Sequence, residues 1–351
     1  MISATPSESS RGAEVAGTAL ASMVIMCCGV VTGLIAARSL GPSGRGELTA
    51  IVVWASVLLY AGTLGIPEAV AYYAATERAL RDRVWATGQA SAVMLGLLVT
   101  LAGWWLIPSI LGEGTALTTS ARWFLLWFAV PCLGSLCAGA WLQGAGFLRA
   151  FNISRTTTSV VYAVAAVMLL AAGSHSVRHF AVAMLVAETA KWLVAGSLGP
   201  LRPALAAGPS SHLARRMLHY GTRVQFGSWA NAANVRLDQL LLSVFATAAS
   251  LGLYVVAVSY ASLLLTIPSS ASFVMLSDIV RHHRAGTARA CLEQWYRRLL
   301  WATLLAAAVL APLGAFVVPL AFGGDFRDAV PLGVLLVPAT AILGMNQILS
   351  T

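Results

Sequence analysis

The most regular feature of the chain is a succession of long apolar runs, separated by short polar stretches. A helix of about twenty apolar residues crosses the roughly 30 Å of hydrocarbon in a bilayer. The pattern therefore predicts an all-α polytopic membrane protein with about ten transmembrane helices. We place these helices at 15–37, 48–74, 86–109, 121–142, 155–172, 179–199, 221–246, 249–276, 299–322 and 329–349.

The composition excludes an ordinary soluble domain. Apolar residues make up 58% of the chain, charged residues only 10%, and the mean hydropathy is +0.80. Soluble domains carry about 25% charged residues, so much of this surface must face lipid. The 5 cysteines form no CxxC pair, and we interpret them as small apolar residues rather than metal ligands.

The net charge of +9 comes almost entirely from arginine, and the arginines lie mainly between the apolar runs. We therefore interpret them as topology signals, not as a nucleic-acid surface. Twelve arginines follow the even-numbered helices and five follow the odd-numbered ones. Because cytoplasmic loops are enriched in basic residues, the even loops and the N-terminus are predicted to be cytoplasmic.

Two stretches of the chain resemble each other at nearly one offset. Residues 46–59 match 252–265 at an offset of 206, and Val130-Pro131 matches Val337-Pro338 at an offset of 207. The match predicts two similar halves, with helices 7–10 repeating helices 1–4. An even number of helices in each half makes the repeats parallel, as in transporters whose halves are related about the membrane normal.

The repeat also predicts the domain organisation. We expect a cytoplasmic tail (1–14), a first six-helix lobe (15–200), a cytoplasmic linker (201–220) and a second lobe of four helices (221–351). By analogy with the first half, two further helices are expected after residue 351. The second lobe is therefore expected to be truncated.

No enzyme motif stands out. The chain contains no GxSxG, no P-loop and no HExxH sequence, so we name no catalytic residue and expect no enzyme. Polar and ionisable groups inside the spans are more informative, because they are costly in lipid.

The seventh predicted helix carries the clearest polar stripe. At spacings of 4, 4, 3 and 4, one face presents Arg223, Gly227, Asn231, Asn234 and Asp238. Such a stripe lines a water-filled cavity or forms hydrogen bonds with a neighbouring helix. We favour the cavity, because a charge lies at each end.

Three further charged positions within the spans belong to the candidate site. Glu188 and Lys191 lie at i and i+3 near the middle of the sixth helix, where they can pair with each other or meet an anionic substrate or a proton. Arg236, on the opposite face of the seventh helix, is a candidate coupling or entry residue, either as an outer-leaflet anchor or as the partner of an acid in the other lobe.

Two residues near the cytoplasmic face are candidates for coupling or entry. Glu68 follows Pro67, where a kink is expected, and it can bind a coupling ion or pair with Arg78 or Arg81. Arg155 opens the fifth helix and can be an interface residue or an entry contact for phosphate.

Several short segments resemble the polysaccharide exporters and O-antigen type oligosaccharide flippases, a family within the MATE-like MOP superfamily. Loose family patterns are similar to the stretches at 38–47, 64–68, 238–242, 250–256 and 322–326, which include Arg38-Ser-Leu-Gly-Pro and Phe322-Gly-Gly-Asp-Phe. Their order and spacing extend the resemblance over essentially the whole chain.

The resemblance implies a two-lobe bundle around a central cavity that opens alternately to the two sides. The implied substrate is an oligosaccharide on undecaprenyl diphosphate, with Lys191 and Arg223 as candidate diphosphate contacts. It also implies the bacterial inner membrane, no cofactor beyond a coupling H+ or Na+, and polysaccharide polymerase and glycosyltransferases as partners. The family pattern has twelve helices, so the resemblance implies that the second lobe is incomplete in this chain.

Three other functions remain open at this point. One is a MATE-type efflux pump driven by protons or sodium, for which Glu68, Glu188 and Asp238 are the available acids. Another is an inactive or truncated membrane paralogue. An integral membrane glycosyltransferase is less well supported, because no acidic pair faces an outer loop.

Overall fold

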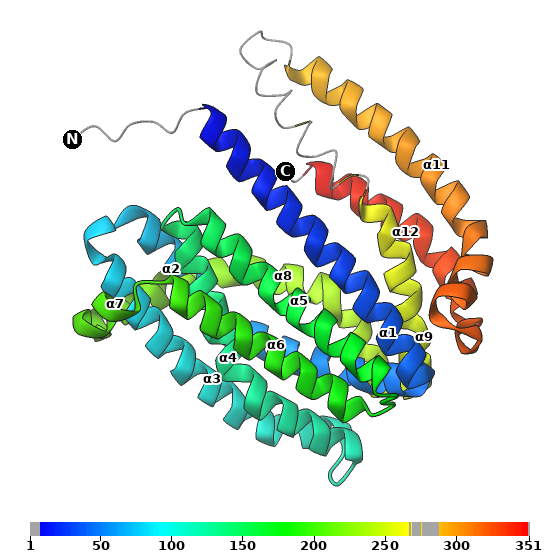
Figure 1. Cartoon of the computed structure of the whole chain (residues 1–351), viewed down its shortest axis with the longest axis horizontal. Coiled ribbons are helices and arrows are strands. Elements are labelled where there is room, and N and C mark those ends of the chain that lie inside the picture. Colours follow the sequence, from blue (N-terminus) through cyan, green and yellow to red (C-terminus); the bar gives the residue numbers. More distant parts are fainter. Residues whose placement is uncertain (1–7, 267, 269–274, 276–287, 350–351) are drawn as a thin grey trace. The chain divides into compact units, whose positions relative to one another are not determined.

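The computed structural model describes residues 8–266, 268, 275 and 288–349, without the side chains of 8–15, 201–202, 228, 230–235, 288–290 and 346–349. Within these ranges every regular element is a helix, which confirms the predicted all-α class (Figure 1). The contacts divide the chain into two compact units. Unit 1 comprises Met1–Ser39 and Glu47–Thr247, and unit 2 comprises Leu40–Gly46 and Ala248–Thr351.

The first helix, α1 (Glu8–Gly62), covers the first predicted helix and most of the second. Its backbone leaves the helical conformation at Gly41, where φ is 64° and ψ is −179°, and Pro42 follows. Glycine adopts a positive φ without the steric cost of a Cβ atom. The stretch between the first two predicted helices, which contains Gly41-Pro42-Ser43-Gly44 and its turn-forming residues, is therefore a kink between two helical segments and not a loop.

The prediction of one continuous helix over 48–74 is wrong at its C-terminal third. The chain turns at Leu64 and Gly65, with φ values of 47° and 67°, and α2 (Ile66–Thr76) begins directly afterwards. Pro67 lies in the first turn of α2, where no amide hydrogen is needed. The helix break therefore precedes the proline that was expected to kink it.

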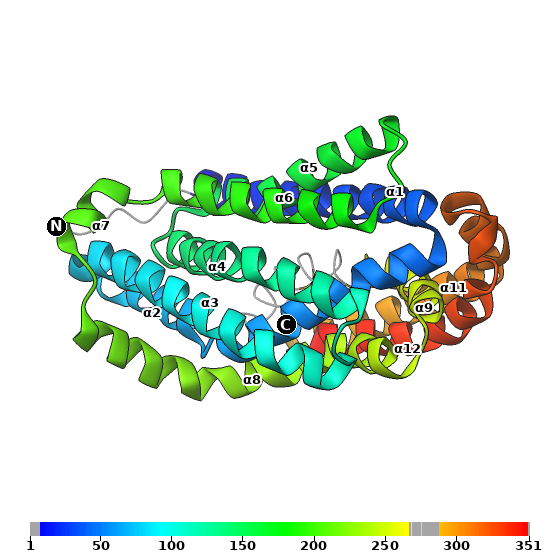
Figure 2. The same cartoon turned by 90° about the horizontal axis from the view of Figure 1, so that it is seen from below.

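Unit 1 contains four long helices that agree with the predicted spans: α3 (Arg81–Leu111), α4 (Ala116–Gly144), α5 (Leu148–Ala171) and α6 (Val177–Leu198). The short η1 (Arg78–Leu80) precedes α3. Helix α4 packs against α3, α6 and α2, and α5 packs against α6. In Figure 2, α5 and α6 lie along one side of the unit, with α3 and α4 beneath them.

The predicted linker 201–220 is largely helical. It holds α7 (Leu201–Ala207) and the first turns of α8 (Ser211–Phe245), whose N-cap Ser210 accepts a hydrogen bond from the Leu213 amide. Helix α8 packs on α2, where the rings of Tyr72 and Tyr220 stack at 4.5 Å. The contacts thus divide the chain after Thr247. The lobe boundaries drawn from the sequence stay a prediction.

Unit 2 contains α9 (Ala248–Ala261), η2 (Ser262–Leu265), α11 (Ala288–Phe322), η3 (Gly324–Phe326) and α12 (Ala329–Leu349). Its core includes Ala261 and Leu264 packed against Val337 and Ala341. The Tyr260 hydroxyl donates a hydrogen bond to the Leu310 carbonyl and so connects α9 to α11.

Two glycines matched by the internal repeat touch each other in unit 2. A Cβ atom on Gly46 would overlap the Ala248 carbonyl and lie 2.9 Å from the Gly252 nitrogen, and a Cβ atom on Gly252 would lie 3.0 Å from the Gly46 nitrogen. Only glycine allows the two backbones to approach this closely. The interpretation of two related halves stays a prediction.

Seven helices of the described residues are long and apolar enough to cross a membrane. The apolar part of α1 counts as one of these, although its 47 residues span about 70 Å, enough for two crossings. Large apolar side chains such as Trp105, Phe316 and Leu335 are exposed, as expected for a surface that faces lipid. The chain is a multi-pass helical membrane protein.

Candidate functional site

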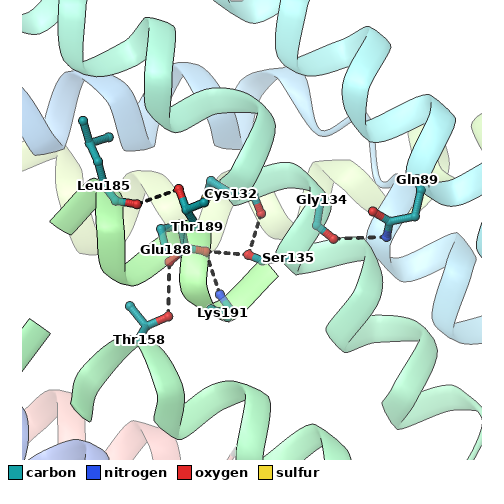
Figure 3. Close-up of polar contacts among 9 residues, drawn as sticks. All are labelled: Gln89, Cys132, Gly134, Ser135, Thr158, Leu185, Glu188, Thr189 and Lys191. Atoms are coloured by element: carbon teal, nitrogen blue, oxygen red, sulfur yellow. Dashed lines mark hydrogen bonds and ion pairs between the residues drawn. The ribbon is translucent and has the colours of Figure 1, made fainter. Parts of the chain in front are cut away.

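The centre of α6 holds the ion pair that its sequence predicted. Lys191 Nζ lies 2.9 Å from Glu188 Oε1, one helical turn apart (Figure 3). The side chains are 18% and 9% exposed, so both charges are largely withdrawn from the surface. Glu188 lies about 16 Å along α6, close to the middle of a membrane-spanning helix.

Hydroxyl groups from two other helices surround the Glu188 carboxylate. Ser135 of α4 donates to Oε1, and Thr158 of α5 lies 3.4 Å from Oε2. The Ser135 hydroxyl also lies 2.9 Å from the Cys132 carbonyl, so its single proton is shared between two acceptors. A buried carboxylate needs such partners, because an unpaired charge in a low dielectric is costly.

The residue after Lys191 fixes this part of α6 against α3 and α4. Trp192 donates from its indole nitrogen to Gln89 Oε1 at 2.9 Å, and Gln89 donates to the Gly134 carbonyl at 3.2 Å. A Cβ atom on Gly134 would collide with the Trp192 ring. The ion pair therefore lies on a helix whose rotation is restricted.

A cavity of about 210 Å³ lies beside the pair, between α1, α4, α5 and α6. Glu188 forms part of its wall, together with hydroxyl and apolar groups: Cys28, Gly29, Thr32, Phe128, Thr158, Ser159, Tyr162, Met184 and Ala187. The cavity is large enough for several water molecules, and the Glu188 carboxylate is the charged group in its wall.

Helix α8 places its predicted stripe differently. Arg223 is exposed. Asp238 is half-buried, and its Oδ1 atom accepts a hydrogen bond from the backbone N–H of Gln239 at 2.8 Å. The side chains of Asn231 and Asn234 lie outside the described residues. Arg236 donates to Gln239 Oε1 at 3.2 Å.

Another polar residue of α8, which lies off the stripe, is almost fully enclosed. Gln225 is 2% exposed, accepts from the Thr63 hydroxyl at 3.0 Å and donates to the Tyr60 carbonyl at 2.8 Å. These bonds hold α8 at the place where α1 ends. Sequence reasoning passed over Gln225 because one glutamine in an amphipathic helix carries no periodic signal.

The structure brings Glu188 and Lys191 together, and it places Arg223 and Asp238 elsewhere in unit 1. Helix α6 packs on α4 and α5, whereas α8 packs on α2 and α3. In Figure 2 these two helices lie on opposite sides of α3 and α4. The grouping of the six candidate residues around one substrate cavity stays a prediction. These residues are Glu188, Lys191, Arg223, Asn231, Asn234 and Asp238.

Glu68 lies in the first turn of α2, half-buried. Arg78 and Arg81 follow the C-terminal end of α2, which lies about 12 Å along the helix from Glu68, and the pairing of Glu68 with either arginine stays a prediction. Arg81 donates to the Ala74 carbonyl at 2.8 Å. The role of Glu68 in ion coupling stays a prediction.

Comparison with known proteins identifies the family. The sequence profile of a family described as "Polysaccharide biosynthesis protein" matches residues 12–277, well over half of the chain. The chain belongs to this family. No curated protein sequence matches at a significant level.

Solved structures show which fold this polysaccharide biosynthesis protein adopts. The lipid II flippase MurJ, in an inward closed conformation, superposes with a TM-score of 0.70 at 12% identity, covering 95% of this chain and 74% of MurJ. An inward-facing multidrug resistance MATE family transporter of the MOP superfamily gives 0.67 at 15% identity, covering 93% and 81%. A MOP superfamily transporter from Pyrococcus furiosus gives 0.51 at 14%, covering 95% and 84%. The fold is that of MOP superfamily transporters.

In this polysaccharide biosynthesis protein, sequence reasoning missed a set of polar contacts between α1 and α5, which we call the α1–α5 seam (Thr18, Ser22, Asn152 and Arg155). Asn152 donates to the Thr18 hydroxyl at 3.0 Å, and Arg155 Nη2 lies 3.5 Å from the Ser22 hydroxyl. Residue numbers rise together along both helices, so α1 and α5 run parallel. The available signal was the spacing of four on α1 and of three on α5, which puts each pair on one helical face.

The second missed contact lies between the end of α2 and the start of α8. Arg216 forms an ion pair with Glu77, and its guanidinium lies 5.0 Å from the centre of the Tyr73 ring. Both charged side chains are partly exposed. Two charges that lie far apart in sequence, in different elements, give no pattern from which this pair could be predicted.

Proposed function

We propose that the chain flips an oligosaccharide carried on undecaprenyl diphosphate from the cytoplasmic to the outer leaflet of the bacterial inner membrane, for polysaccharide export. The observation that carries this proposal is membership of the polysaccharide biosynthesis family over residues 12–277. The similarity in fold to a structure described as a lipid II flippase supports the same class of transport. Alternating access of two helical lobes is the proposed mechanism.

Lys191 on α6 and Arg223 on α8 are the two proposed diphosphate contacts, and because these helices lie on opposite sides of α3 and α4, they would meet the diphosphate at different stages of transport. An ammonium group can bind phosphate as a point charge, and an exposed guanidinium can bind it through two parallel hydrogen bonds. Lys191 is already paired with Glu188. The incoming diphosphate must therefore displace the Glu188 carboxylate from Lys191, or Glu188 must take up a proton when the diphosphate binds. We include Asn231, Asn234 and Asp238 as further contacts along α8.

Glu188 is the proposed site for a coupling ion, either H+ or Na+. Its position in the wall of the 210 Å³ cavity supports this role, because an ion inside the cavity can contact the carboxylate directly. Glu68 remains a second candidate. No other cofactor enters the proposal.

The proposed orientation puts the N-terminus in the cytoplasm. The arginine distribution supports it, and the parallel course of α1 and α5 fits two odd-numbered helices that cross in the same direction. Polysaccharide polymerase and glycosyltransferases are the proposed partners, because they consume and supply a lipid-linked oligosaccharide.

The test is a flipping assay in vesicles with a fluorescent lipid-linked oligosaccharide. We expect the wild-type chain to move the label between leaflets. The double variant Glu188→Gln/Lys191→Gln keeps a neutral polar pair on α6, and we expect it to fold normally but to flip at least tenfold more slowly. Arg122→Gln, in an arginine that contacts only the Trp104 carbonyl and ring among the described residues, is the matched control.

Two results would count against the proposal at different levels. Flipping at the wild-type rate by the double variant would show that Lys191 does not bind the substrate, but it would not contradict the proposed transport function. A wild-type chain that moves no lipid-linked oligosaccharide in vesicles would remove the transport function itself.

MATE-type efflux of organic cations is the second candidate function. It is favoured by one observation, the acid in the cavity wall of unit 1, together with a fold similar to that of a MATE transporter. A cell strain that gains resistance to cationic dyes on expression of this chain, and loses it with Glu188→Gln, would favour efflux over flipping.

A further inference from the structure

Helix α8 has an unusually polar exposed surface for a helix of its length. Although it has 35 residues, it is not one of the seven described helices that are long and apolar enough to cross a membrane. Within its predicted span, Thr222 and Arg223 are exposed and Asp238 is half-buried. Charged residues are costly in hydrocarbon, so helices of membrane proteins turn them towards other protein groups or towards water. The exposed face of α8 near Arg223 therefore fits a wet surface better than lipid tails.

Two exposed aromatic residues follow Arg223 on this face. Phe226 is 72% exposed and Trp229 is 41% exposed. At spacings of three residues, Arg223, Phe226 and Trp229 form an oblique row in which each side chain is turned about 60° from the one before. Phe226 lies about 4.5 Å beyond Arg223 along the helix axis, and Trp229 lies about 9 Å beyond it. A cation is thus followed by two aromatic rings on one continuous surface.

The Trp229 ring is held in place from within the protein. Its indole N–H donates to the Tyr60 carbonyl at 3.2 Å, near the end of α1. Phe226 packs against Trp229 edge to face, with ring centres 5.6 Å apart and ring planes at 65°. A tryptophan that anchors a helix at the membrane surface keeps its N–H for the wet interface, whereas this N–H is already used. The two rings are therefore fixed relative to each other while they remain exposed.

This row matches the chemistry of a sugar that is joined to a diphosphate. The axial C–H groups of a pyranose form an apolar face whose hydrogens carry partial positive charge, and the face of an aromatic ring carries partial negative charge. A guanidinium binds a phosphate group through two parallel hydrogen bonds. Because one oxygen atom joins the first sugar to the diphosphate, a diphosphate at Arg223 can bring the first sugars beside Phe226 and Trp229.

We propose that Phe226 and Trp229 stack against the sugar rings nearest the diphosphate of a lipid-linked oligosaccharide. Arg223 holds the diphosphate, and the two rings distinguish a carrier that bears sugar from an empty carrier. The inference rests on the substrate named in the proposed function, and it adds a sugar contact to a face of α8 that holds a proposed diphosphate contact. Such a contact allows the chain to select the loaded carrier for transport.

The test is a titration of the purified full-length chain in detergent, followed by native mass spectrometry. The probes are the lipid-linked oligosaccharide extracted from the source organism and undecaprenyl diphosphate without sugar. We expect the wild-type chain to bind the first probe about tenfold more tightly than the second. The double variant Phe226→Leu/Trp229→Leu should bring the ratio of the two dissociation constants close to one, because leucine is apolar but has no ring face. Phe226→Tyr keeps the ring and should keep the wild-type ratio.

Matched variants separate the two rings from the cation and from a general membrane effect. Phe316→Leu and Trp105→Leu replace rings that are 76% and 73% exposed on two of the apolar helices, α11 and α3, and they should leave the ratio unchanged. Arg223→Gln should weaken the binding of both probes by the same factor, because both carry the diphosphate. Gel filtration and thermal unfolding of each variant establish that it is folded.

The outcomes separate this inference from the proposed function. A folded double variant that keeps the wild-type ratio overturns the inference, and an equal loss of affinity for both probes would place the rings against the lipid chain instead. Equal affinity of the wild-type chain for both probes also overturns it, and flipping by that chain would leave the transport function standing. A failed flipping assay with an intact ratio that depends on the two rings would remove transport and leave the sugar contact in place.

Discussion

Helices α6 and α8 both carry charged residues at helical spacing in the sequence, but the structure surrounds these charges differently. On α6, the charges of Glu188 and Lys191 are paired and enclosed by hydroxyl groups from α4 and α5. On α8, Asp238 and Arg236 both bond to Gln239 of the same helix, and Arg223 is exposed. The difference teaches that residue spacing reveals a polar face of a helix, but not whether the side chains on that face already have hydrogen-bond or ion-pair partners within the protein.

The most disruptive change should be the loss of one partner on α6. Lys191→Gln leaves the Glu188 carboxylate enclosed without its cation, and breaking a buried pair in this way costs about 3 kcal/mol or more. Unfolding in mixed micelles, followed by tryptophan fluorescence, measures the loss. The free energy of unfolding should recover substantially in the double variant Glu188→Gln/Lys191→Gln.

Arg223→Gln is the matching change on α8. Because Arg223 is exposed, its replacement should alter the free energy of unfolding by no more than about 0.5 kcal/mol. Equal losses for the two single variants would contradict the comparison.

The next largest effect should come from the glycine contact that holds α8 against α2. In Gly65→Ala, the new Cβ atom overlaps the Gly221 carbonyl at a position where φ is 67°, so we expect a loss of about 2–3 kcal/mol. A Cβ atom on Gly227 of α8 would meet no other atom within 4 Å, so Gly227→Ala should instead stabilise the helix by up to about 1 kcal/mol. The same unfolding measurement applies, and a neutral Gly65→Ala variant would show that α2 and α8 separate easily.

The smallest effect should come from the surface pair at the start of α8. Glu77 raises the pKa of Arg216 above its ordinary value, so the stabilisation from Arg216 is present throughout the working pH range and is lost only at extremely alkaline pH. Salt is therefore the better test than pH. Arg216→Gln should lower the melting temperature slightly in low salt and not measurably in 1 M salt, because exposed pairs are screened. A difference that persists in high salt would show a role beyond the ion pair.

The hydrophobic runs predicted most of the fold because each is long enough to cross a bilayer. They missed the break at Leu64 and Gly65, because Leu64-Gly-Ile-Pro67 is almost as apolar as the helix around it. What fixes that break is a backbone approach to Gly221, more than 150 residues away, and such a contact leaves no local trace.

The candidate site was predictable only where its partners share a helix. Glu188 and Lys191 are three residues apart, so their pairing follows from helical geometry. The hydroxyl groups of Ser135 and Thr158 come from other helices, and serine or threonine in a membrane helix usually bonds to its own backbone. The α1–α5 seam stayed hidden for the same reason, because it needs the register of two helices and not the pattern of one.

The contact between Gly46 and Gly252 has a consequence for ancestry. In a symmetric dimer, a residue near the twofold axis meets its own copy. Here two matched glycines at an offset of 206 touch each other within one chain. A half-length ancestor that assembled as a dimer would have needed glycine there in both subunits at once. Fusion of such a dimer would make each position a separate site, so the two halves could diverge elsewhere while neither glycine admits a side chain.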